Sequence, residues 1–88
     1  NFEKNQITLF ATCGVSPEIP EYYFKKNGYL NFKFVNEANA DYIIMTNRTV
    51  FDNKNNQITN CFDKFKGIDV FKVERNGLLL SAIRKIKM

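Results

Sequence analysis

Histidine and tryptophan are absent from this chain of 88 residues, which has only two cysteines, two prolines and four glycines. Without histidine the chain has no Ser-His-Asp or Cys-His catalytic group, no histidine metal site and no ordinary acid or base near neutral pH. The two distant cysteines, Cys13 and Cys61, cannot form a zinc site without other ligands. The sequence therefore predicts no catalytic residue, no cofactor and no metal ligand.

Long apolar runs are also absent, and none is long enough to cross a bilayer. The chain begins at Asn1, and no charged leader with an apolar core precedes Phe2, so we expect no signal peptide. Its length fits one domain, and a hydrophobic content of 44% is enough for a compact core. We therefore expect residues 1–88 to be a single soluble domain excised from a longer protein.

The charge is modestly basic, with thirteen basic and nine acidic residues and a formal net charge of +4. The basic residues are spread along the chain, and only Ile83–Lys87 is locally dense. A nucleic-acid binder usually concentrates its charge in a stripe and uses arginine to grip phosphates and bases. We therefore expect no nucleic-acid partner, and a weak attraction to an anionic lipid surface fits better.

The first part of the chain has the pattern of a strand, a helix and a strand. Gln6–Cys13 is apolar and β-branched on both faces, as in a central strand that is covered on both sides. A helix is expected from Pro17 to about Asn27, where Gly28 ends it. Tyr29–Val35 alternates between apolar and polar residues, which indicates a half-buried strand. This order predicts a βαβ unit with parallel strands and a right-handed crossover.

One row of side chains on the predicted helix is expected to pack on the sheet. Its members stand three or four residues apart, as a helix face requires. They are Ile19, Tyr22, Tyr23 and Lys26.

The middle of the chain gives a weaker signal. Asp41–Thr46 is predicted to be a third strand, apolar on both faces. Asn47–Asn60 is polar and lacks a period, so a loop is expected, with Asp52–Gln57 as its most loop-like part. Ile58–Phe65 fits a short strand or a helical turn equally well, and Gly67 ends it.

Asp69–Ile86 reads as two strands folded about Asn76 and Gly77, and Asn-Gly between such runs is a strong hairpin signal. A two-residue turn predicts the pairs Arg75–Leu78, Glu74–Leu79, Val73–Leu80, Lys72–Ser81, Phe71–Ala82, Val70–Ile83 and Asp69–Arg84. The last pair is expected to be an ion pair worth roughly a few tenths of a kcal/mol. The face expected to meet the core contains Phe71, Val73, Leu78, Leu80 and Ala82.

Together these elements predict a fold of the α/β class. It is expected to be a small two- or three-layer sandwich with a mixed sheet of about five strands. The βαβ unit forms one side of this sheet, and the C-terminal antiparallel hairpin forms the other.

The weak candidates for a ligand site lie where the first strand ends and the helix begins, since α/β folds bind ligands at such places. Gly14 and Ser16 belong to this turn, and Arg48 at the end of the third strand is a candidate for binding an anion. A single glycine is not a phosphate-binding loop, so the structural interpretation of each residue is the stronger one.

Cys13 and Cys61 can come together, because the carboxyl ends of parallel strands emerge at the same edge of a sheet. In an oxidising compartment a disulfide between them is possible, and it would contribute about 4 kcal/mol in the chain-entropy description. Two reduced cysteines in the core are the alternative, which the sequence favours slightly.

Two segments in the second half of the chain carry a family resemblance. They are Ala40–Arg48 (ADYIIMTNR) and Val70–Ile86 (VFKVERNGLLLSAIRKI), with a cysteine-bearing polar stretch between them. They resemble the C-terminal end of bacterial polytopic membrane glycosyltransferases that are similar to the dolichyl-phosphate-mannose mannosyltransferase superfamily. Thr12–Phe24 (TCGVSPEIPEYYF) is similar to the opening of such a domain.

The resemblance implies a parent protein that transfers a sugar, for example mannose, from a polyprenyl-phosphate donor on the outer side of the membrane. The catalytic acidic residues of such proteins lie in loops between membrane helices, so no residue of this chain takes over a catalytic role. The domain would be periplasmic or otherwise extracytoplasmic. Its partners would be the membrane portion of the same polypeptide and, further, the acceptor substrate or an anionic lipid surface.

Two other functions stay open on the residues alone. One is a free-standing small α/β interaction module that binds a protein or a small anion. The other is a minimal enzyme that uses Cys13 as its nucleophile, although no histidine is present to activate the thiol.

Overall fold

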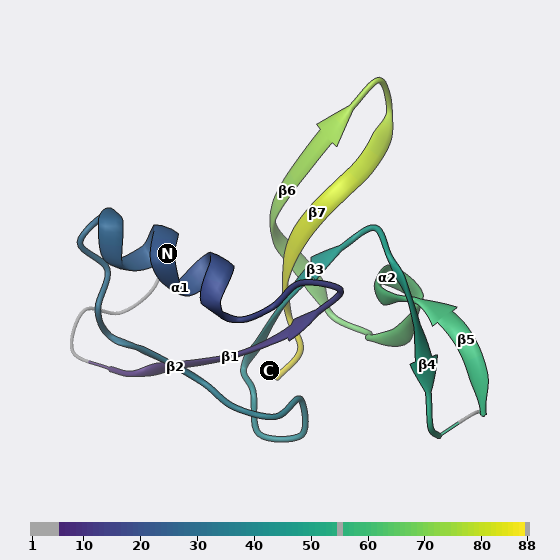
Figure 1. Ribbon diagram of the computed structural model, residues 1–88, viewed down its shortest axis with the longest axis horizontal. Helices are drawn as coiled ribbons and strands as arrows, with labels where there is room; N and C mark the ends of the chain where they lie inside the picture. Colours follow the sequence, from purple (N-terminus) through teal and green to yellow (C-terminus); the bar gives the residue numbers. More distant parts are fainter. Residues whose placement is uncertain (1–5, 55, 88) are drawn as a thin grey trace.

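The computed structural model describes residues 6–54 and 56–87 and has a mixed five-stranded sheet in the order β2-β1-β3-β7-β6 (Figure 1). β1 lies parallel to β2 and β3, whereas β7 is antiparallel to β3 and β6. This confirms the predicted α/β class, with its βαβ unit and its C-terminal hairpin. The elements are β1 (Thr8–Cys13), α1 (Glu18–Lys26), β2 (Phe32–Phe34), β3 (Tyr42–Thr46), β4 (Thr49–Asp52), β5 (Gln57–Asn60), α2 (Cys61–Lys64), β6 (Ile68–Arg75) and β7 (Leu78–Lys85).

Helix α1 covers one face of β1 and β2, and it does so through Phe24. The centroid of the Phe24 ring lies 5.2 Å from that of Phe10, 5.1 Å from that of Phe32 and 6.4 Å from that of Phe34. Phe10 is fully buried in this cluster. Aromatic pairs at such separations contribute beyond the area that they bury, so these rings fix the helix on the sheet.

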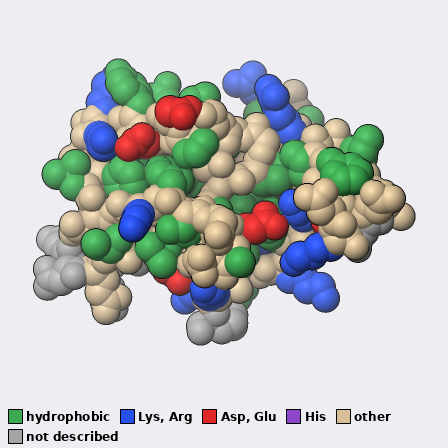
Figure 2. All heavy atoms as spheres, turned by 60° about the horizontal axis from the view of Figure 1, so that its bottom comes forward, with side chains coloured by type: hydrophobic (Ala, Val, Ile, Leu, Met, Phe, Trp, Pro, Cys, Tyr) green, Lys and Arg blue, Asp and Glu red, His purple; other side chains and the backbone are tan. Residues whose placement is uncertain are grey.

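The row of α1 that the sequence singled out does not pack on the sheet, so this prediction is wrong. Ile19, Tyr22 and Tyr23 are exposed, and the Lys26 ammonium lies 5.9 Å from the centre of the Tyr22 ring. The tyrosine hydroxyls and the lysine ammonium of this row remain in water, whereas Phe24 has no polar atom and has three rings of the sheet strands within reach. Figure 2 shows hydrophobic side chains at the surface over the half of the molecule that contains α1, β1 and β2, with acidic and basic groups among them.

The opposite face of the sheet carries the main core. Its buried members are Ala11, Cys13, Ala40, Ile43, Met45, Cys61 and Ala82. Cys61 is the first residue of α2, and Val50 of β4 also packs against this cluster. Because Phe10 and Ala11 are neighbours on one strand, their side chains point to opposite faces. The fold is therefore a three-layer sandwich, with α1 on one side of the sheet and α2 with the β4–β5 hairpin on the other.

The predicted loop over Asn47–Asn60 is wrong, because most of this segment forms the two strands of a second sheet. Val50 pairs with Thr59 and Phe51 with Ile58 in this hairpin. These short strands lie among polar residues that hide their alternation in the sequence.

The ambiguous segment that follows is both a strand and a helical turn. β5 ends at Asn60 and α2 begins at Cys61. The Asn60 side-chain oxygen accepts a hydrogen bond from the backbone N–H of Phe62 at 2.9 Å, which caps the short helix.

The turn of the β6–β7 hairpin lies at Asn76 and Gly77, as predicted. Both residues have positive φ, 53° and 80°, which is the combination that a type I′ turn requires. Arg75 lies opposite Leu78 beside the turn, so the predicted register is confirmed there.

Two β-bulges break the predicted register in the middle of the hairpin. Val73 lies opposite Ser81 and not opposite Leu80, so Leu80 is an extra residue on β7. A second irregularity leaves Val70 as the extra residue on β6, after which Asp69 again lies opposite Arg84 as predicted. The observed partners therefore differ from the predicted ones by one residue only between the two bulges.

The bulges decide which side chains share a face, because cross-strand partners point to the same side of a sheet. Leu79 lies opposite Glu74, and Ala82 lies opposite Lys72. Because Lys72 and Glu74 are two residues apart on a strand without an extra residue between them, they point to one face, and their partners Leu79 and Ala82 both face the core. Without the bulge at Leu80, Leu79 and Ala82 would point to opposite faces.

The predicted core face of the hairpin is therefore wrong for most of its members. Ala82 is buried as expected. Phe71, Val73 and Leu78 are exposed instead, because the hairpin extends beyond the core and nothing in the described chain covers this face (Figure 1).

Candidate functional site

A disulfide joins the end of β1 to the start of α2. Cys13 and Cys61 are bonded, with 5.8 Å between their Cα atoms, and both residues are buried. The parallel pairing of β1 with β3 places the segments after both strands at one edge of the sheet, which is how these cysteines meet. Cys13 has no thiol in this state, so it cannot serve as the nucleophile of a minimal enzyme.

Gly14 lies directly against the disulfide. Its φ is +81°, in the left-handed region, and a Cβ atom there would lie 2.5 Å from the Thr46 hydroxyl oxygen and 3.2 Å from the Cys61 sulfur. The Thr46 hydroxyl donates a hydrogen bond to the Gly14 carbonyl at 3.0 Å. Glycine is therefore required here for close packing and turn geometry, which is a structural role.

Arg48 belongs to the same cluster through its backbone. Its N–H donates to the Thr46 carbonyl at 2.8 Å, and its carbonyl accepts from the N–H of Cys61 at 2.8 Å. Its Cβ would lie 3.0 Å from a Cβ on Gly14, while the residue as a whole is exposed. The structure thus brings the backbone of Arg48, Gly14 and the disulfide together.

Ser16 lies two residues further on, at the start of α1. Its hydroxyl donates a hydrogen bond to the Glu18 carboxylate. A carboxylate beside the N-terminus of a helix is favourable, since it faces the positive end of the dipole. This position therefore already holds a negative group, which argues against Ser16 as a binder of external anions.

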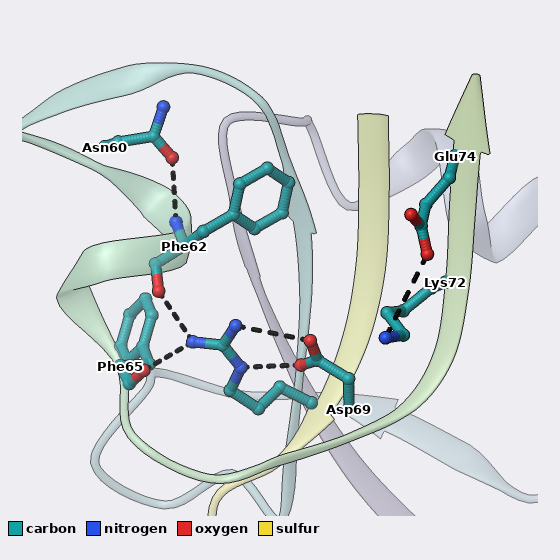
Figure 3. A network of polar contacts seen from close by, with 7 residues as sticks. Asn60, Phe62, Phe65, Asp69, Lys72 and Glu74 are labelled. Carbon is teal, nitrogen blue, oxygen red and sulfur yellow. Dashed lines mark hydrogen bonds and ion pairs between the residues drawn. The ribbon is translucent and has the colours of Figure 1, made fainter. Parts of the chain in front are cut away.

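A second polar cluster is centred on Arg84 and links the hairpin to α2. Figure 3 labels its members Phe62, Phe65 and Asp69. The Arg84 Nε donates to Asp69 Oδ1 at 2.6 Å, and Nη2 donates to Oδ2 at 3.4 Å. Nη1 donates to the carbonyl oxygens of Phe62 and Phe65, at 2.7 and 2.5 Å. The predicted ion pair of Asp69 and Arg84 is confirmed, and both side chains are largely buried.

Sequence reasoning missed the two carbonyl contacts of this cluster. They satisfy the backbone at the end of α2, where helix carbonyls have no intrahelical partner. The planar guanidinium reaches a carboxylate and two carbonyls at once, which an ammonium group cannot do in the same geometry. Hence Arg84 is a structural residue that fixes the base of the hairpin.

Within residues 6–54 and 56–87, no three acidic, cysteine or histidine side chains are grouped so that they could hold a metal ion. In the same residues no helix has the length and apolar content to span a bilayer. No family model matches the chain, and neither does any curated protein or solved structure.

Proposed function

We propose that this chain is a non-catalytic, extracytoplasmic domain of a membrane glycosyltransferase that uses a polyprenyl-phosphate sugar donor. The two segments that resemble such proteins, Ala40–Arg48 and Val70–Ile86, contain β3, β7 and most of β6. These strands are direct neighbours in the sheet. The resemblance therefore covers one continuous half of the sheet, which supports a common structural unit.

The observation that carries the proposed compartment is the disulfide between Cys13 and Cys61. Disulfides persist in the periplasm and outside the cell, and they are rare where thiols are kept reduced. In this bond both cysteines of the chain are used, and both are buried in the main core. A periplasmic or extracellular domain is consistent with this arrangement.

The domain would act as an accessory to chemistry performed elsewhere in the parent. Its partner is the membrane portion of the same polypeptide, whose loops would hold the catalytic carboxylates. Stabilising that portion, or holding the acceptor next to it, are the roles that remain for a domain of this kind.

The gene upstream of Asn1 provides the first test. Several apolar segments of about 20 residues each, enough to span a bilayer, would support the proposal. An immediate start codon would eliminate it. A parent protein from which residues 1–88 are deleted should still bind the lipid-linked donor, and loss of donor binding with an intact membrane portion would contradict the accessory role.

The runner-up is a free-standing interaction module, and the exposed β6 strand favours it. β6 is an edge of the main sheet and pairs only with β7 among the described strands. An edge strand can accept a further strand from a partner protein. The same gene sequence separates the two proposals, because a free-standing module requires no membrane segments.

A further inference from the structure

The β6–β7 hairpin has two chemically different faces. Cross-strand pairing assigns eight residues to the face away from the main core, which we call the outer face. They are Ile68, Phe71, Val73 and Arg75 of β6 and Leu78, Ser81, Ile83 and Lys85 of β7. Five of these are apolar, and none is acidic.

Both carboxylates of the hairpin lie on the opposite face. Asp69 is held there by Arg84 at 2.6 Å, and the Glu74 carboxylate lies 4.0 Å from the Lys72 ammonium. Each is thus paired with a cation of its own face. The outer face consequently has one cation at each end, Arg75 beside the turn and Lys85 at the base, and no negative group between them.

Four of the five apolar members of the outer face are exposed to water, and Ile83 is half-buried. Ile68, Phe71 and Leu78 are each more than half exposed, and Val73 is 41% exposed. The strands run for about 25 Å at the usual rise of a β-strand. An apolar strip of this length is a candidate interaction surface in a small protein, whereas single exposed apolar residues are not.

The charge of the chain is concentrated in the same segment. Residues 66–87 contain six basic and two acidic side chains, a balance of +4, whereas the remaining residues contain seven of each. The hairpin segment therefore carries the whole formal net charge. In contrast, the acidic residues Glu18 and Glu21 of α1 offset its two lysines, so the exposed apolar residues of that helix have no net positive charge beside them.

We propose that the outer face of the hairpin docks on an anionic lipid bilayer, with its apolar side chains at the headgroup boundary and Arg75 and Lys85 on lipid phosphates. An apolar strip flanked by cations and free of carboxylates has the charge and polarity that interfacial binding requires. This goes beyond the proposed function, since it requires no sugar transfer. If the 88-residue chain does not bind vesicles, the proposal that it belongs to a glycosyltransferase still stands. If the gene contains no membrane segments, vesicle binding by the hairpin can still be observed.

The absence of tryptophan permits a direct test of orientation. Phe71→Trp and Phe51→Trp each introduce a single reporter at a phenylalanine of similar exposure, 58% on β6 and 55% on β4. With vesicles of phosphatidylglycerol and phosphatidylcholine, the emission of the first variant should shift to shorter wavelength and that of the second should not. No shift at position 71, or an equal shift at both positions, would overturn the proposal.

Vesicle cosedimentation tests the two cations. The double variant Arg75→Gln/Lys85→Gln should bind about 25-fold more weakly, at about fivefold per basic residue near the surface. The control Lys33→Gln/Lys54→Gln removes the same formal charge from β2 and from the β4–β5 turn, and it should stay within about twofold. Equal losses in the two variants would show a general charge effect and overturn the assignment to this face.

Two other occupants would be recognised in the same samples. If the chain forms dimers without lipid, and Phe71→Ser abolishes them while Phe51→Ser does not, the outer face is a subunit interface and the proposal is wrong. If an oligonucleotide binds more tightly than the vesicles and Phe71→Ser leaves that binding unchanged, the cations serve nucleic acid and the proposal is equally wrong.

Discussion

Reduction of the Cys13–Cys61 disulfide should remove a large part of the stability of this domain. The bond links residues 48 positions apart, and it closes a loop that contains β2, β3 and the β4–β5 hairpin. In the chain-entropy description, a loop of this size corresponds to about 4 kcal/mol. A domain of this length has a total unfolding free energy of about 4–13 kcal/mol, so the bond accounts for about 30% of it or more.

Urea unfolding followed by far-ultraviolet circular dichroism measures this contribution. For a domain of this size, a loss of 4 kcal/mol lowers the unfolding midpoint by about 2–4 M, because each molar of urea removes about 1–2 kcal/mol. The protein should be compared with and without a reductant, and mass spectrometry after alkylation should verify that both thiols are free in the reduced sample.

The double variant Cys13→Ala/Cys61→Ala is the control. It should unfold at the same urea concentration with and without reductant, and at or below the midpoint of the reduced protein, since it also loses two buried sulfur atoms. A reduced protein with verified free thiols and an unchanged midpoint would refute the reasoning, because the crosslink would then contribute nothing to the folded state.

Three further substitutions test other parts of the fold by the same unfolding measurement. Gly14→Ala should lower the unfolding free energy by about 2 kcal/mol or more, because the added Cβ meets a hydroxyl oxygen at 2.5 Å. The control Gly28→Ala has a similar φ of +82° but open space around it, and it should lower the unfolding free energy by about 1 kcal/mol. Equal losses in the two variants would contradict the packing argument. Phe24→Ala should lower the unfolding free energy by about 3 kcal/mol, because it empties the centre of the aromatic cluster, whereas Tyr22→Ala should change it by no more than about 0.5 kcal/mol. The reverse order would mean that the helix face predicted from the sequence packs on the sheet after all. Arg84→Lys keeps the positive charge but removes the planar guanidinium with its several N–H donors, and it should lower the unfolding free energy by about 1–2 kcal/mol. An unchanged unfolding free energy would mean that the contacts to the α2 carbonyls contribute nothing.

The parts of the fold that local chemistry determines could be predicted from the sequence. Asn76 and Gly77 need positive φ for a type I′ turn, and this alone places the hairpin and its first pair. Gly28 likewise marks the end of α1. The parallel strands follow from the length of the crossover helix, and that parallel order also brings Cys13 and Cys61 to one edge.

The failures concern choices that only packing makes. On α1 two rows of side chains compete for the sheet. Phe24 packs there in place of a longer row, because three rings of β1 and β2 surround it. In the hairpin, Leu79 and Ala82 are three residues apart, so no regular strand can point both at the core. The bulge at Leu80 lets both side chains point at the core, and no local sequence pattern predicts this bulge.

The candidate site shows the same division. Gly14 and Arg48 do meet beside the disulfide, as the strand order indicates. The hydroxyl of Ser16 donates to the carboxylate of Glu18, which stands two residues away in the sequence. The sequence-based interpretation of Ser16 as a ligand-site residue did not consider that this carboxylate competes with an external anion. The carbonyl contacts of Arg84 depend on where α2 lies relative to β7, which is tertiary information.

The strand order also dictates when this sheet can be completed. β7 follows all the other described elements in the sequence, yet it lies between β3 and β6 and pairs with both. Until β7 has been synthesised, β6 has no partner, and Ile43 and Met45 on β3 lack the strand that covers their open edge. Such non-local pairing delays completion of the sheet until β7 has been synthesised. A ribosome that stops before Leu78 would therefore release a polypeptide with two unpaired strand edges, and quality control would meet it as an aggregation-prone species.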